Sequence, residues 1–206
     1  MTMPRWSLSL KTAPTSEPIS LEEAKAQLRV SLDSADDDEL IEALIIAARE
    51  QAETFTGRAL LSQTWYLKLD TFPDDGSPIL VPRPPLQSVT AITYVDMNGA
   101  TQTWAASLYQ VSAPAGPKAQ NGRILPAYGQ YYPLTRDQMD AVSIEFLCGW
   151  TEATEALKVP TAIKLGMKVA LTSWFMRRGD DSLVELVKSV PETAELLWWP
   201  YVVTPW

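Results

Sequence analysis

The sequence of 206 residues lacks histidine altogether and contains a single cysteine, Cys148. Histidine is the commonest general base and metal ligand in proteins, so its absence excludes every Ser-His and Cys-His catalytic pair. One cysteine cannot form an intramolecular disulfide. Cys148 lies in an apolar stretch with Ile144, Phe146 and Leu147, which predicts a small buried core residue. Most familiar hydrolytic chemistry is thereby excluded.

Basic residues and long hydrophobic runs are also scarce. The chain has 17 Lys and Arg against 25 Asp and Glu, a formal net charge of -8, which argues against sequence-independent capture of DNA. The apolar runs are too short to span a bilayer, and the N-terminus lacks the apolar core of a signal peptide. We therefore expect a soluble protein of cytoplasmic origin with no membrane partner.

No motif for a metal, a phosphate or a catalytic pair is evident. The glycines are scattered, and the acidic run of residues 33–39 lacks the spacing of a calcium loop, so it is interpreted as the acidic start of a helix. We expect no cofactor, no metal and no catalytic residue. Loop carboxylates such as Asp70, Asp96 and Glu145 leave one alternative open, a carbohydrate-binding or glycan-hydrolysing protein whose aromatic residues stack on sugars.

Three helices are predicted from capping and apolar spacing. Ser20 and Glu23 have the spacing of a capping box at the start of a helix over residues 20–29. A second helix covers residues 40–57, with Leu40, Leu44, Ala48 and Phe55 as its core stripe and Gly57 as its end. A third begins after Pro160 and ends near Gly179, with Ile163, Met167, Leu171 and Trp174 facing the core.

Residues 63–147 are rich in β-branched residues, prolines and turn dipeptides. Strands are predicted at residues 65–72, 79–82, 89–96 and 141–149, with a hairpin about Asn98 and Gly99. A short helix after Ser182, another from Pro191 and an extended tail over residues 201–206 complete the chain. The sequence predicts an α+β fold, a small three-helix bundle with an inserted antiparallel β region and an extended C-terminal arm. We expect one domain over residues 1–206, with a helical core (18–58 and 159–179), a β-rich insertion (62–149) and the arm (180–206).

The helices carry more apolar surface than one core can use. Ile46 lies opposite the core stripe of its helix, and Leu165, Val169 and Met176 form a second stripe on the third helix. A helix that is apolar on two sides is buried on two sides. Either it lies inside its own subunit or it contacts a neighbouring subunit, and the spacing leaves both possibilities open.

The C-terminal arm concentrates aromatic residues where chain ends are usually polar. Its aromatic and β-branched residues, interleaved with prolines, favour docking on another chain over folding back on the same domain. The candidate docking residues are Trp198, Trp199, Tyr201, Val202, Val203 and Trp206.

The order of these segments resembles the head-tail connector, or adaptor, proteins of long-tailed bacteriophages and gene transfer agents. The resemblance rests on ISLEEAKAQLRV, DDDELIEALIIAAREQAETFTGRAL, QTWYLKLDTFP and VPRPPLQSVTAITYVDMNGATQTW. It continues through YQV, RILPAYGQYYP and AVSIEFLCGW to VPTAIKLGMKVALTSWFMRR and LLWWPY. The Trp-rich end, with its YVVTPW extension, is richer in aromatics than the family pattern.

This resemblance implies a non-enzymatic virion protein at the head-tail junction, assembled in the host cytoplasm. It implies a ring of about a dozen copies beneath the portal protein, with a stopper or tail-completion protein on the opposite face. DNA would pass through the lumen without sequence-specific binding, and a negative lumen would let it slide. Ile46, Leu165, Val169 and Met176 would contact neighbouring subunits, and the arm would dock on the portal. Another head-completion or tail-completion subunit remains an alternative.

Overall fold

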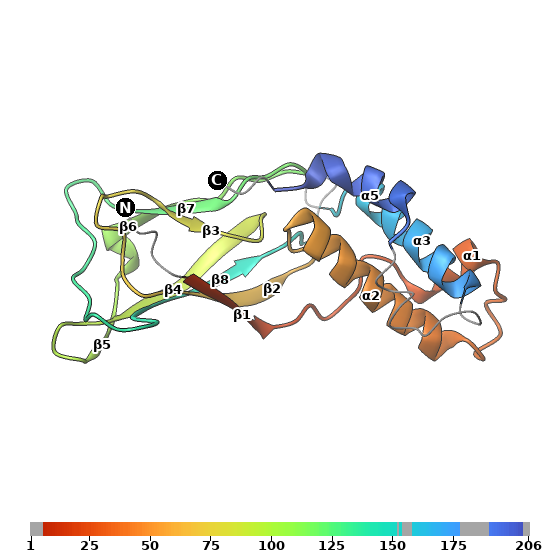
Figure 1. Cartoon of the computed structure of the whole chain (residues 1–206), viewed down its shortest axis with the longest axis horizontal. Coiled ribbons are helices and arrows are strands. Elements are labelled where there is room, and N and C mark those ends of the chain that lie inside the picture. Colours follow the sequence, from red (N-terminus) through yellow and green to blue (C-terminus); the bar gives the residue numbers. More distant parts are fainter. Residues whose placement is uncertain (1–5, 152, 154–157, 178–189, 204–206) are drawn as a thin grey trace. The chain divides into compact units, whose positions relative to one another are not determined.

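The computed structural model (Figure 1) describes residues 6–151, 153, 158–177 and 190–203. The chain divides into two compact units, each built from two separate stretches. We call residues 1–14 and 62–150 the sheet unit, and residues 15–61 and 151–206 the helical unit. Antiparallel sheets and helices are both present, so the predicted α+β class is confirmed.

The larger sheet of the sheet unit has five antiparallel strands in the order β1-β2-β8-β4-β5. These strands are β1 (Trp6–Thr12), β2 (Gln63–Leu69), β8 (Val142–Cys148), β4 (Leu86–Val95) and β5 (Thr101–Thr103). In the central strand β8, Val142, Ile144, Phe146 and Cys148 are buried and alternate with half-buried residues. This period of two places one face of the sheet in the core. The core position predicted for Cys148 is confirmed.

A second sheet of three strands completes the core of the sheet unit. It has the order β3-β7-β6, with β3 (Ile79–Val81), β7 (Gly122–Pro126) and β6 (Tyr109–Ser112), which follows a 3-10 turn, η1 (Ala106–Leu108). A β-carbon on Gly122 would lie 3.0 Å from the β-carbon of Leu86 in β4, so only glycine fits here. Phe72 and Tyr132 stack at 5.3 Å beside Trp104 and form an aromatic cluster in this core.

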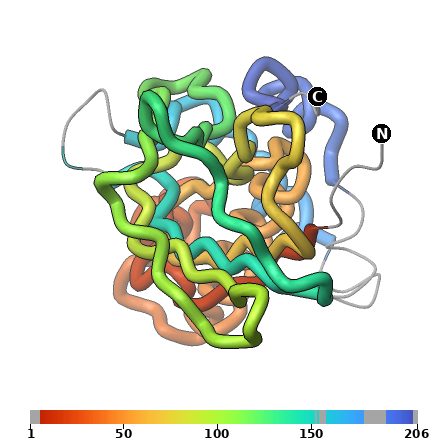
Figure 2. Tube along the Cα trace, turned by 90° about the vertical axis from the view of Figure 1, so that its left-hand side faces the viewer, coloured from red at the N-terminus to blue at the C-terminus, as the bar shows by residue number. Residues whose placement is uncertain are grey.

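The predicted hairpin about Asn98 and Gly99 is present between β4 and β5. Gly99 has φ +86°, a conformation that glycine adopts without strain. The loop between β7 and β8 runs alongside this hairpin (Figure 2), where Arg136 N–H donates to the Val95 carbonyl at 3.0 Å. Val95 N–H in turn donates to the carbonyl of Ala141 at 2.8 Å. These bonds join the long loop to the end of β4 in the larger sheet.

Three strands were not predicted from the sequence. β1 is an edge strand that is almost wholly exposed, and the alternation of Trp6, Leu8 and Leu10 with polar residues was the strand signal that the sequence analysis missed. β6 and β7 are short, and β7 ends at Pro126. Short strands bounded by proline resemble loops when the sequence is considered alone.

The helical unit contains four described α-helices and one 3-10 turn. They are α1 (Leu21–Leu28), α2 (Asp38–Thr56), α3 (Thr161–Met176), α5 (Glu192–Trp198) and η3 (Trp199–Tyr201). The capping box of α1 is confirmed: Glu23 N–H donates to the Ser20 hydroxyl at 3.1 Å, and Ser20 N–H donates to the Glu23 carboxylate at 3.2 Å. Gly57 ends α2 with φ +71°, as expected.

The predicted core stripe of α2 is partly wrong. Leu44 and Ala48 are buried, but Leu40 and Phe55 are only half-buried. The buried face also takes in Ile41, Ile45 and Ala52. The stripe is turned because α1 packs on α2 as well as on α3 and covers a side that periodicity along α2 does not reveal.

The core stripe predicted for α3 is confirmed. Ile163, Met167, Leu171 and Trp174 are all buried. α5 packs against the same helix, and Trp198 lies over Gly166, where a side chain would collide with its indole ring. The predicted helix after Pro191 is therefore present as α5.

Replacing Gly166 by alanine should destabilise the chain, although alanine favours helices by about 1 kcal/mol over glycine. The added β-carbon would lie 2.9 Å from two ring carbons of Trp198, so α5 must shift. We expect a net loss of about 1 to 3 kcal/mol in the free energy of unfolding, measured by urea titration with circular dichroism. A stabilised variant would contradict this packing.

Candidate assembly surfaces

The second apolar stripe predicted for α3 lies on the surface of the helical unit. Leu165 and Met176 are 47% and 75% exposed, and Val169 between them is half-buried. The same helix buries its opposite face in the core. The stripe therefore contributes little to the core of its own unit and is available to another chain.

On α2, Ile46 is likewise an apolar residue on the surface of the helical unit, with a side chain that is 42% exposed. It borders a shallow groove between α2, the start of α1 and the segment before it. The groove is lined by Ser16, Glu17, Ile19, Ser20, Leu21, Glu42, Ile45 and Ile46. Glu39, Glu42 and Glu50 are exposed on the same helix, so an apolar centre has an acidic border.

The C-terminal tryptophans have opposite environments. Trp198 is 0% exposed, and its indole N–H donates to the Ile163 carbonyl at 3.1 Å. Trp199 is 70% exposed and meets Phe55 edge to face at 6.3 Å. A docking role for Trp198 would require it to leave this core, whereas the indole of Trp199 is accessible to another chain without unpacking.

The end of the described chain is held against the C-terminus of α2. Val203 N–H donates to the Thr56 carbonyl at 2.8 Å, and the Tyr201 carbonyl accepts a 2.6 Å hydrogen bond from Arg58. Tyr201 closes the 3-10 turn η3, so the tail predicted as extended begins only at Val202. Trp206 and the helix predicted after Ser182 lie outside the described residues.

Arg58 is a buried cation at this anchor. Burial lowers the pKa of Arg58 to about 10, and the Tyr201 side chain opposes that shift. The guanidinium is therefore still charged at neutral pH. Its bond to a main-chain carbonyl fixes the position of η3, and through it the exposed indole of Trp199, relative to α2.

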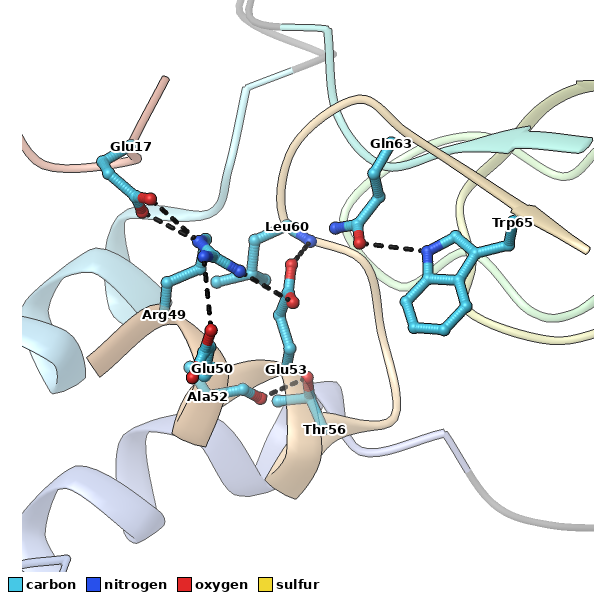
Figure 3. Close-up of polar contacts among 9 residues, drawn as sticks. All are labelled: Glu17, Arg49, Glu50, Ala52, Glu53, Thr56, Leu60, Gln63 and Trp65. Atoms are coloured by element: carbon cyan, nitrogen blue, oxygen red, sulfur yellow. Dashed lines mark hydrogen bonds and ion pairs between the residues drawn. The ribbon is translucent and has the colours of Figure 1, made fainter. Parts of the chain in front are cut away.

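A second buried cation, Arg49, joins three segments of the helical unit (Figure 3). Its Nε lies 2.8 Å from the Glu17 carboxylate, and its Nη1 lies 3.3 Å from the Glu53 carboxylate. Glu53 also accepts the main-chain N–H of Leu60 at 2.8 Å. Burial raises the pKa of Glu17 in spite of the neighbouring Arg49. The network links α2 to the chain on both sides of it.

The carboxylates considered for glycan hydrolysis have structural partners. Asp96 accepts N–H donors from Asn98 and Ala100 in its hairpin, and its hydrogen bond from Gln102 leads the contacts that hold its pKa below the usual range. Asp70 accepts the main-chain N–H of residue 140 at 3.0 Å, and Glu145 pairs with residue 11 at 2.8 Å. These contacts are those of turn formers and strand-face ion pairs.

Several exposed apolar residues were missed by the sequence analysis. Leu196 on α5 and Leu32 before α2 are exposed in the helical unit, and Tyr128, Tyr131 and Met139 are exposed in the loop between β7 and β8. The aromatic composition of that loop was the available signal, but composition cannot distinguish buried from exposed tyrosines. Tyr132 of the same loop, for example, is half-buried and packs against the buried Trp104.

Within the part of the chain that the structure describes, no group of three or more His, Cys, Asp or Glu side chains is placed to hold a metal ion. None of the described helices combines the length and the apolar character needed to cross a bilayer.

The fold is that of a mixed α+β subunit whose helical unit exposes apolar residues on two helices, an arrangement typical of proteins that associate. Residues 18–110 match the family described as "Phage gp6-like head-tail connector protein". This match extends from the segment before α1 into β6, and it confirms the resemblance seen in the sequence.

Three solved structures have a similar fold over nearly the whole chain. A chain of "Neck of empty GTA particle computed with C6 symmetry" matches with a TM-score of 0.74 and 22% identity, covering 97% of this chain and 96% of that one. A chain of "Virion of native gene transfer agent (GTA) particle" matches with a TM-score of 0.73 and 20% identity, covering 96% of each chain. A chain of "Neck of native GTA particle computed with C12 symmetry" matches with a TM-score of 0.67 and 21% identity, covering 97% of this chain and 96% of that one. The comparison with curated proteins found no match.

Proposed function

We propose that this chain is a structural subunit of the head-tail junction of a phage or phage-like particle. Copies form a ring of about a dozen that joins the portal vertex of the head to the tail or to the next head-completion protein. Packaged DNA passes through the lumen, and no step is catalytic. The match of residues 18–110 to the head-tail connector family carries this proposal.

Two further observations support it. The folds of gene transfer agent neck and virion chains align with almost all of this chain, and one of those structures is described with C12 symmetry. The net charge of -8 suits a lumen along which DNA slides, because like charges keep the phosphate backbone from adhering.

The docking surface of this proposal lies at the C-terminal end of the helical unit. Trp199 projects from η3, and the half-buried Tyr201, Val202 and Val203 follow it. Because this segment is anchored as far as Val203, it presents a fixed surface to the portal. Exposed, rigidly held tryptophans are typical centres of protein interfaces.

Replacing Trp199 by alanine should block attachment of tails to heads without unfolding the subunit. The indole is mostly exposed, so its loss removes interface contacts and little core packing. We expect DNA-filled heads without tails in electron micrographs of particles made with this variant, and a subunit with unchanged circular dichroism.

The matched control is Trp6→Ala, which removes a tryptophan of similar exposure from the sheet unit. Tailed particles at the normal yield from Trp199→Ala would overturn the docking surface. Normal yields from a strain that lacks the protein would overturn the connector function itself.

A further inference from the structure

The outer face of α2 is acidic around an apolar centre. The helix has five acidic residues, and Glu39, Glu42 and Glu50 of these are exposed near Ile46. Its single basic residue, Arg49, is buried and is held by Glu17 and Glu53, and only a long contact of 3.7 Å joins it to the exposed Glu50. The face therefore offers negative charge and an exposed isoleucine to any partner.

The outer face of α3 has the opposite charge around its own apolar centre. Its 16 residues include Lys164 and Lys168 but no Asp or Glu. These half-buried lysines lie together on one side of the stripe of Leu165, Val169 and Met176 on the helical wheel. Glu23 of α1 lies 3.4 Å from Lys168 and also interacts electrostatically with Lys164, so one carboxylate faces two lysines and neutralises their positive charge only in part.

These charges decide which faces can meet when copies associate. A twofold contact between two α2 faces would oppose glutamates to glutamates, and one between two α3 faces would oppose lysines to lysines. Contact between α2 of one copy and α3 of another brings opposite charges together and covers apolar residues on both sides. Such a heterologous contact generates a ring when its rotation closes.

We infer that the outer face of α2 docks on the outer face of α3 of the next copy, with Ile46 against Leu165 and Val169 and with Glu42 and Glu50 beside Lys164 and Lys168. This inference rests on the proposed ring and assigns its subunit contact. Ala43, exposed one turn before Ile46, leaves space that the longer Leu165 side chain can fill.

Charge exchange between the faces tests the contact with the full chain. The variants are Glu42→Lys with Glu50→Lys in one protein, and Lys164→Glu with Lys168→Glu in a second. Each variant alone opposes like charges, so we expect its self-association to weaken by about tenfold or more in sedimentation velocity experiments at low salt. An equimolar mixture pairs opposite charges at every contact and should restore association to the wild-type level.

The outcomes separate this inference from the proposed function. Wild-type protein that remains monomeric at millimolar concentration and in the presence of particles would overturn the ring, and the contact with it. Wild-type association that neither variant weakens, or that the mixture does not restore, would overturn the contact alone.

Cross-linking provides a measurement that does not depend on charge reversal. A bismaleimide should join Ile46→Cys copies to Leu165→Cys copies in a mixture, and neither variant should form dimers by itself. The native Cys148 is buried, and the wild-type protein, which has only this cysteine, measures the background cross-linking. Equal cross-linking within one variant would overturn the heterologous contact, because it would indicate a twofold interface.

Discussion

Replacing Trp198 by alanine should lower the free energy of unfolding by about 3 to 5 kcal/mol, the range measured for large buried aromatic residues. The side chain is fully buried and fills the space over Gly166 between α5 and α3. Its indole N–H also satisfies the Ile163 carbonyl, and its ring meets Phe55 at 5.8 Å. Denaturant unfolding followed by circular dichroism measures the loss.

The adjacent residue provides the control for this experiment. Trp199→Ala removes the same side chain from an exposed position and should change the free energy of unfolding by less than about 1 kcal/mol. Trp198→Phe retains an aromatic ring but loses the hydrogen bond to Ile163. Its loss of unfolding free energy should therefore lie between those of Trp198→Ala and Trp199→Ala. Equal losses at positions 198 and 199 would contradict the packing of α5 on α3.

The contrast between these neighbouring tryptophans shows what the sequence could not predict. Composition placed aromatic residues near the C-terminus, but only tertiary packing determines which one is buried. The partner of Trp198 is the bare backbone at Gly166, 32 positions earlier, and a missing side chain leaves no periodic signal. Residues 198 and 199 were therefore predicted to have one role, whereas the structure places them in opposite environments.

Helix ends were predicted well because capping is a local property. Ser20 and Glu23 satisfy each other's main-chain groups, and Gly57 adopts the left-handed conformation that ends α2. The core stripe of α2 and the edge strand β1 were predicted less well. The packing of α2 and the pairing of β1 both involve segments that are distant in sequence. α1 turns the buried face of α2 toward Ile41, and β1 is defined by its pairing with β2.

The exposed stripe of α3 was predictable for a different reason. Leu165 and Met176 stand opposite the core stripe on one helix, and a helical wheel separates the two faces without tertiary information. What covers the stripe is a property of an assembly. The acidic border of Ile46 on α2 became informative only once the structure showed Arg49 turned inward, leaving that face with one sign of charge.

Replacing Glu53 by alanine should cost about 3 to 5 kcal/mol of stability, because it removes one of the two carboxylates that hold the buried Arg49 and leaves the buried main-chain N–H of Leu60 without its acceptor. Glu53 accepts from Arg49 with one carboxylate oxygen and from the main-chain N–H of Leu60 with the other. Urea titration at neutral pH measures the loss. The matched control is Glu50→Ala, which removes an exposed partner of the same arginine at 3.7 Å and should have little effect.

Salt distinguishes this network from the contact proposed between copies. Counterions screen exposed charges over about 8 Å at physiological ionic strength, but they reach a buried pair poorly. The destabilisation by Glu53→Ala should therefore be nearly the same at low and high salt, whereas association through Glu42 and Glu50 should weaken as salt is added. If salt removed the Glu53 effect, Arg49 would be accessible to solvent and its network would not be part of the core. The inward position of Arg49, on which the acidic character of the outer face of α2 depends, would then be wrong as well.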